Sequence, residues 1–117
     1  MLHISSSNRY FLCSEPADMR KSFHGLAAMV KYCMGADVLN GDIYIFLSKR
    51  RNAIKLLSFE GDGFALYYKR LEQGTFELPI YDAMLRSIAI TDAQLIMILK
   101  GIVLKTATYR RRYTRKK

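Results

Sequence analysis

The sequence has no tryptophan, and it has only two cysteines and two histidines among 117 residues. A structural zinc site usually takes four cysteine or histidine ligands, and His3 and His24 lack the spacing of such ligands. Cys13 and Cys33 form no C-x-x-C pair, and each lies in an apolar segment. We therefore expect both thiols to be buried, reduced and free of metal.

Long hydrophobic runs are also missing. The longest apolar stretch, residues 93–104, contains Lys100 and falls well short of the roughly 20 residues that a transmembrane helix needs. No apolar run follows a basic start at the N-terminus, so a secretory signal peptide is not expected. These absences predict a cytoplasmic protein without a membrane span.

The sequence lacks catalytic motifs too. It contains no serine or cysteine nucleophile motif, no G-x-x-x-x-G-K-[ST] and no G-x-G-x-x-G. Asp18 and Asp92 stand at predicted helix starts, and Asp42 opens a predicted strand. Glu60 and Asp62 flank a predicted turn. A two-metal carboxylate cluster would have to use these same residues, so we expect a non-enzymatic protein without a cofactor.

Positive charge is what the sequence has in excess. Nineteen Lys and Arg against ten Asp and Glu give a formal net charge of +9. Basic and acidic side chains balance over residues 1–48, so the excess follows Ser48. Residues 109–117 hold six of the basic residues without apolar periodicity, which predicts a flexible tail. The charge predicts a polyanionic partner, and we expect DNA.

Residues 42–71 have the pattern of strands joined by tight turns. Strands are expected over residues 42–47, 53–59 and 64–71, and the first alternates apolar side chains on both faces, as in a covered strand. Gly61 and Gly63 suit the positive φ angles of a hairpin turn. This pattern predicts an antiparallel meander. Three shorter strands are expected over residues 9–13, 75–78 and 87–90.

Two helices are expected around this sheet. Residues 18–34 carry apolar side chains at helical spacing, with Asp18 as N-cap and Gly35 as the stop. Residues 91–100 begin with a capping-box pattern formed by Thr91 and Gln94. The sequence thus predicts one α+β domain over residues 1–108. It consists of a small antiparallel sheet packed with two helices, followed by the basic tail 109–117.

Basic residues of the second half are the candidate nucleic-acid contacts. Lys69 and Arg70 are expected to point to opposite faces of their strand, because side chains alternate. The full candidate set is Lys49, Arg50 and Arg51 in one turn, Lys69 and Arg70 on the third strand of the meander, and Arg110, Arg111, Arg112 and Arg115 in the tail.

Aromatic residues in the meander leave a second interpretation open. Residues 63–68 partly match the RNA-recognition motif, which stacks bases on aromatic side chains, but its glycine-aromatic-glycine core is missing. We favour the simpler interpretation, in which one face of the sheet is filled by the packing of Phe64, Leu66 and Tyr68.

Two segments, residues 18–26 (DMRKSFHGL) and 61–76 (GDGFALYYKRLEQGTF), resemble the TnpB accessory proteins of IS66-type bacterial insertion sequences. The similarity covers about residues 9–102. Phe59, Tyr67 and Leu78 stand where relatives often carry large aromatics, often Trp. These TnpB proteins are distinct from the RNA-guided nucleases of the same name.

The resemblance implies an accessory factor for transposition, encoded beside a separate DDE-type transposase, and it supplies no catalytic residues. We therefore expect a protein that binds DNA, or a complex of DNA and transposase, mainly through phosphate contacts. A subunit that docks on the transposase without touching DNA, and a small RNA-binding module, remain alternatives.

Overall fold

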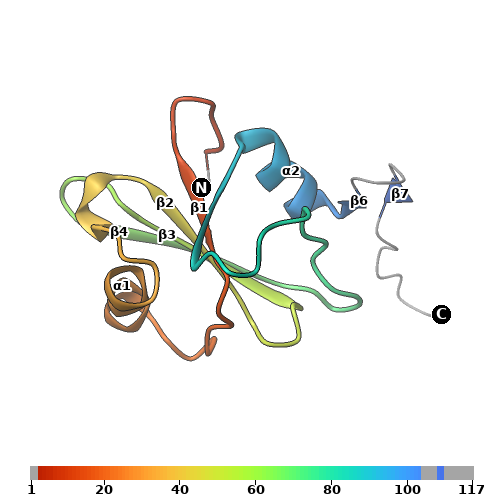
Figure 1. Cartoon of the computed structure of the whole chain (residues 1–117), viewed down its shortest axis with the longest axis horizontal. Coiled ribbons are helices and arrows are strands. Elements are labelled where there is room, and N and C mark those ends of the chain that lie inside the picture. The colour runs from red at the N-terminus through yellow and green to blue at the C-terminus, as the bar shows by residue number, and fades with distance from the viewer. Residues whose placement is uncertain (1–2, 104–107, 110–117) are drawn as a thin grey trace.

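The computed structural model of the chain describes residues 3–103 and 108–109. These residues form a five-stranded sheet in the order β4-β3-β2-β1-β5, helices on both of its sides and a separate two-stranded sheet (Figure 1). The elements in chain order are β1 (Tyr10–Cys13), α1 (Phe23–Tyr32), the 3-10 helix η1 (Val38–Asn40), β2 (Ile43–Leu47), β3 (Ala53–Phe59), β4 (Phe64–Arg70), β5 (Ser87–Ile90), α2 (Asp92–Lys100), β6 (Ile102–Val103) and β7 (Thr108–Tyr109). The α+β class expected from the sequence is confirmed.

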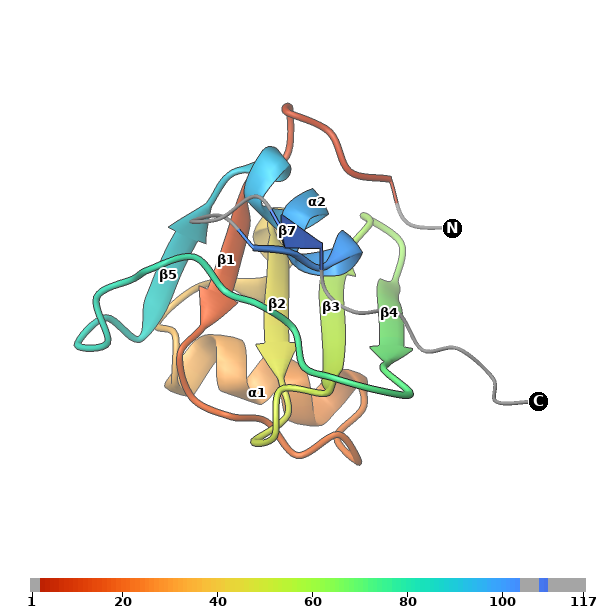
Figure 2. The ribbon, with the colours of Figure 1, turned by 90° about the vertical axis from the view of Figure 1, so that its right-hand side faces the viewer.

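Each face of the large sheet is covered by a different layer (Figure 2). α1 covers one face, where Leu26 and Val30 pack in a cluster with Tyr44. α2 and the loop between β4 and β5 cover the other face, where Leu95 packs in a cluster with Ile45. All five residues of β2 are therefore buried, as its uninterrupted apolar pattern predicted.

The sheet as a whole is mixed. The meander β2-β3-β4 is antiparallel as expected, with Ile45 opposite Leu56. β1, however, pairs parallel with β2, with Tyr10 opposite Ile43. The chain between these two strands contains α1, and a parallel pair requires a long crossover of this kind. β5 then completes the sheet, antiparallel to β1.

α1 begins at Phe23, later than the expected start at Asp18. Asp18 does not cap the helix, because its carboxylate accepts a hydrogen bond of 2.9 Å from the backbone N–H of Arg20. Ser22 occupies the N-cap position instead. Gly35 has a φ of +66° just beyond the helix, in agreement with its expected role as a helix stop.

The strand expected over residues 75–78 does not form. The segment lies in the irregular loop of residues 71–86, where the backbone N–H of Phe76 donates to the carbonyl oxygen of Arg51 at 2.7 Å. The Phe76 ring is only 1% exposed and belongs to the core on the α2 face. The apolar residue that suggested a strand therefore fills the core from a loop.

Most of the remaining local patterns are confirmed, but Gly63 does not have the positive φ angle expected for it. The Thr91 hydroxyl accepts from the backbone N–H of Gln94, and the Gln94 side chain accepts from that of Thr91, so the capping box starts α2. Gly101 ends α2 with a φ of +78°, and Gly61 has a φ of +93° in the β3-β4 turn. Within the part of the chain that the structure describes, neither helix is long and apolar enough to cross a membrane.

Candidate nucleic-acid interface

The turn between β2 and β3 carries three of the predicted contacts. Lys49, Arg50 and Arg51 are all exposed. A backbone hydrogen bond of 3.0 Å from Ser48 to Ala53 closes the turn, and the N–H of Arg51 donates to Ser48 at 2.9 Å. Arg51 has a φ of +58°, in the left-handed region. The turn is thus tightly folded and holds these cations at one end of the sheet.

Arg70 reaches the same end of the sheet from the last position of β4. It lies opposite Ala53 in the β3-β4 register, and the N–H of Leu71 donates to the carbonyl oxygen of Asn52 at 2.8 Å. The Arg70 side chain is exposed. We call the surface formed by Lys49, Arg50, Arg51 and Arg70 the basic end.

The loop before α1, which contains Lys21, runs beside the basic end (Figure 2). The N–H of Ala17 donates to the carbonyl oxygen of Leu47 at 2.8 Å, which places this loop beside the end of β2. The buried Lys55 ammonium donates to the carbonyl oxygens of Met19 and Lys21, at 2.8 and 2.7 Å. Sequence reasoning missed Lys21, because the bonds that position it come from a lysine buried in a strand.

Arg20, in the same loop, is paired with an acid. Its Nη2 lies 2.7 Å from Oδ2 of Asp18, although its side chain is 91% exposed. Hydrogen bonds from the Arg20 side chain, and then from its backbone, lower the pKa of Asp18 from 3.8 to about 2. The pair remains charged at neutral pH, so Arg20 adds little net positive charge to the basic end.

Lys69 points away from the basic end. It is half-buried, and its Nζ donates to the carbonyl oxygen of Leu99 at 3.2 Å. That carbonyl belongs to the last turn of α2, where a cation interacts favourably with the helix dipole. The structure therefore gives Lys69 a role in attaching α2 to β4. Its role in DNA contact stays a prediction.

The tail arginines Arg110, Arg111, Arg112 and Arg115 lie outside the described residues. Their contribution to DNA binding also stays a prediction, and it rests on their charge alone.

Acidic side chains border the basic end. Glu72 and Glu77 are exposed in the loop of residues 71–86, and the bond from Phe76 to Arg51 holds this loop against the turn. This loop lies on the α2 face, whereas the chain before α1 lies on the opposite side of the sheet (Figure 2). Glu15, in the chain before α1, is also exposed and lines a pocket together with Lys49 and Arg51. Acidic side chains from both segments therefore border the basic end.

Some side chains of β4 pack against neighbouring residues, and others are exposed. The Phe64 ring packs on Phe59, with centroids 5.2 Å apart, and Leu66 packs against the α1-side cluster. Tyr68 is 48% exposed, and the Lys55 ammonium lies 4.8 Å from its ring centroid. The packing interpretation fits Phe64 and Leu66, while Tyr68 keeps an accessible face.

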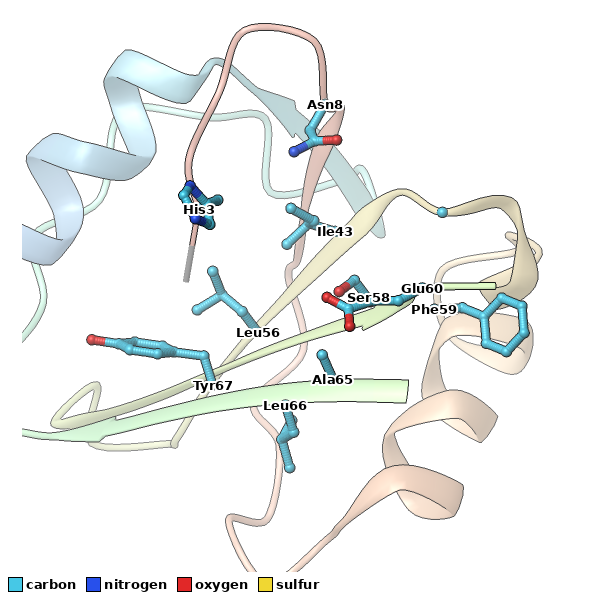
Figure 3. A pocket seen from close by; sticks show the side chains of 11 residues that line it. His3, Asn8, Ile43, Leu56, Ser58, Phe59, Glu60, Ala65, Leu66 and Tyr67 are labelled. Atoms are coloured by element: carbon cyan, nitrogen blue, oxygen red, sulfur yellow. The ribbon is translucent and has the colours of Figure 1, made fainter. Parts of the chain in front are cut away.

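A groove of about 390 Å³ lies at the opposite end of the sheet, next to the β3-β4 turn (Figure 3). Leu56 and Ala65 contribute apolar surface, and His3, Ser58 and Glu60 contribute polar groups. No hydrogen bond connects these three polar side chains to one another in the part of the chain described.

Neither thiol is part of a disulfide, and Cys13 is buried while Cys33 is half-buried. Burial raises the pKa of Cys13, and a side-chain hydrogen bond with Glu15 raises that of Cys33. Such thiols stay protonated at neutral pH. Across residues 3–103 and 108–109, no three His, Cys, Asp or Glu residues gather in a group that could hold a metal ion.

Comparison with known proteins assigns the chain to a family. A family model described as IS66 Orf2 like protein matches residues 8–109. The chain belongs to the IS66 Orf2-like family. The uncharacterized protein y4hO of Sinorhizobium fredii is 31% identical over 102 residues, which cover 87% of each chain. The uncharacterized protein y4jC of the same species is 34% identical over 79 residues, or 68% of each chain. No solved structure matches the chain.

This membership confirms the resemblance drawn from residues 18–26 and 61–76. It identifies the chain as an accessory protein of an insertion sequence. The second of these segments contributes Arg70 to the basic end.

Proposed function

We propose that this IS66 Orf2-like protein is a non-catalytic accessory factor that binds DNA, alone or together with the transposase, through phosphate contacts. The observation that supports this proposal is the convergence of Lys49, Arg50, Arg51 and Arg70 at the basic end. Cations held on a folded turn neutralise backbone phosphates whatever the base sequence. The basic tail adds further charge to the same protein.

Phosphate contacts are favoured over base readout by the composition of the helices. A recognition helix places several polar side chains against base edges in the major groove. The exposed basic residues of α1 and α2 are limited to His24, Lys31 and Lys100. We therefore expect the affinity for DNA to depend strongly on salt and weakly on sequence.

A matched pair of double variants tests the basic end. Lys49→Gln/Arg50→Gln removes two charges from the turn, and Lys31→Gln/Lys100→Gln removes two exposed charges from the last turns of the helices. Each phosphate contact adds about 0.9 to the slope of log K against log salt, so the turn variant should lower the slope by about 2. The helix variant should leave it nearly unchanged. Fluorescence anisotropy on duplex DNA across a salt series measures both.

Equal slopes for the two double variants would reject the basic end as the DNA contact. A marked preference for single-stranded oligonucleotides, lost on Tyr68→Ala, would instead favour the RNA-binding alternative with base stacking on β4.

One further observation favours the protein-docking alternative. Ile80, Met84 and Leu85 in the loop of residues 71–86 are 81%, 88% and 51% exposed. Exposed apolar side chains in one loop are typical of contact sites. Copurification with the transposase of the same element, after nuclease treatment, tests this function. Binding that survives the nuclease and is lost on Ile80→Ser/Met84→Ser would support it.

A further inference from the structure

β4 is an edge of the large sheet with an unpaired outer side. It pairs with β3 along its whole length, and no strand among the described residues pairs with its other side. The strand is seven residues long and begins with five consecutive apolar or aromatic residues, Phe64 to Tyr68. Natural proteins usually protect such an edge, since it can accept a further strand.

The backbone hydrogen bonds show which peptide groups face outward. The N–H of Leu71 donates to Asn52, and that of Glu60 donates to the carbonyl oxygen of Gly63, both at 2.8 Å. Hydrogen-bonded pairs alternate along an antiparallel ladder, so Ala65, Tyr67 and Lys69 direct their peptide groups to β3. The outward-facing peptide groups are those of Phe64, Leu66, Tyr68 and Arg70.

Side chains alternate between the two faces along this edge. Figure 3 shows Ala65 and Tyr67 on the groove side of β4 and Leu66 on the other side. On the Leu66 side, the ring centroids of Phe23 and Phe64 lie 6.4 Å apart. Phe23 and Tyr68 are 39% and 48% exposed, so the edge is flanked by accessible aromatic surface.

We propose that a second copy of the chain pairs with β4, antiparallel and about a twofold axis at Leu66. In this register Leu66 faces its own copy, Phe64 faces Tyr68 of the other chain, and Asp62 faces Arg70. The outward peptide groups then bond to one another, and each cross-strand pair is complementary in size or charge. The five-stranded sheets join into one continuous sheet.

The groove side of β4 fits the same register. Tyr67 of one chain lies opposite the small side chain of Ala65 of the other, and Lys69 lies opposite Gly63. The bulky residue of each pair thus meets a small one. Sliding the strands by two residues in one direction places Phe64 opposite Arg70 and Asp62 opposite Glu72, which removes the opposite charges. Sliding them in the other direction calls for Glu60 opposite Arg70, but Glu60 lies on the β3 side of the turn, where its N–H donates to Gly63. The charge pairing therefore selects the register and favours a second copy of this chain.

The dimer interface shares Arg70 with the basic end, and its expected strength is modest. A strand pair of this length buries less than the standard 1,200–2,000 Å² of a stable interface, so we expect a dissociation constant in the micromolar range. Sedimentation of the nuclease-treated full chain at roughly 1–200 μM should show a reversible monomer-dimer equilibrium. A monomer throughout that range overturns the proposal.

Charge reversal tests the register. Asp62→Arg and Arg70→Asp each place like charges opposite each other twice in the dimer, and each should weaken dimerisation roughly tenfold or more. The double variant Asp62→Arg/Arg70→Asp restores both opposite-charge pairs and should return the dissociation constant to that of the original chain. A dimer indifferent to the single changes, or not rescued by the double change, overturns the proposal.

A backbone variant gives a second test that needs no charge change. Tyr68→Pro removes an outward N–H while leaving the β3-β4 ladder intact, because proline is tolerated where the N–H faces away from the neighbouring strand. Circular dichroism checks the fold, and the folded variant should be monomeric. A dimer of unchanged strength in this variant excludes pairing through β4. Dimerisation that appears only when residues 110–117 are removed would identify the tail as the occupant of the edge and also overturn the proposal.

Discussion

The Lys55 ammonium in the middle of β3 donates a hydrogen bond of 2.8 Å to the carbonyl oxygen of Met19, 36 positions earlier in the sequence. A second bond of 2.7 Å reaches the carbonyl oxygen of Lys21. In a helix these carbonyls would accept N–H groups from four residues further on. Lys55 therefore holds the segment before α1 as a loop and positions it beside the basic end.

Replacing Lys55 by methionine should destabilise the protein by about 2–3 kcal/mol, because two carbonyls lose a charged donor that is buried in the fold. Urea denaturation measures the change. Lys31→Met is the matched control, since Lys31 is exposed on α1, and it should change stability by less than about 0.5 kcal/mol. Similar values for the two variants would contradict a structural role for Lys55.

The variant Arg51→Gly distinguishes the effect of the Arg51 charge on DNA binding from the effect of its backbone conformation on stability. Arg51 has a φ of +58°, a region that disfavours side chains and suits glycine. The variant should be more stable by about 0.5–1 kcal/mol and should bind DNA with a salt slope lower by about 1. Arg50→Gly removes the same charge at the neighbouring position, which has no positive φ, and should lose stability. Thermal unfolding compares the two variants, and a loss of stability for Arg51→Gly would show this argument to be wrong.

The pair of Asp18 and Arg20 has a predictable pH response. The pKa of Asp18 is lowered to about 2 in the folded protein, chiefly by the hydrogen bonds from Arg20. A lowered folded-state pKa stabilises the fold above the unfolded value, and this contribution is lost as the pH falls toward 2. NMR titration should find the low value, and Arg20→Gln should raise it toward 3.8. An unchanged titration in that variant would contradict the pairing.

Local patterns predicted much of this fold. Thr91 and Gln94 are three residues apart, so the capping box that starts α2 could be recognised directly. Gly61 marked the β3-β4 turn, and the apolar residues of β2 marked a strand covered on both faces. Each of these features depends on neighbours within a few positions of the chain.

Features that depend on contacts between distant residues could not be predicted from the sequence. The parallel pairing of β1 with β2 follows from the path of the crossover through α1, which periodicity does not record. Phenylalanine is common in strands, so Phe76 suggested one. Phe76 instead reaches the core from a loop, and the hydrogen bond from its N–H to the carbonyl oxygen of Arg51 holds it there. The alternation of side chains along a strand correctly predicted that Lys69 and Arg70 point to opposite faces of β4. It could not predict that Lys69 donates to the carbonyl oxygen of Leu99, because that carbonyl belongs to α2.

The six basic residues of the tail after Tyr109 should supply much of the sequence-independent affinity for DNA. If the tail and the basic end together neutralise about six phosphates, log K should fall with log salt at a slope near −5. Affinity would then drop roughly a thousandfold between ~50 and ~200 mM salt.

Truncation after Tyr109 removes this charge and keeps β7, which pairs with β6. The truncated protein should show a flatter slope and an unchanged unfolding temperature, because the removed residues have no apolar periodicity to contribute to a core. Anisotropy on duplex DNA across the salt series, with thermal unfolding as the control, measures both quantities. A tail that serves only solubility predicts equal slopes for the two proteins, and that result would confine DNA binding to the basic end.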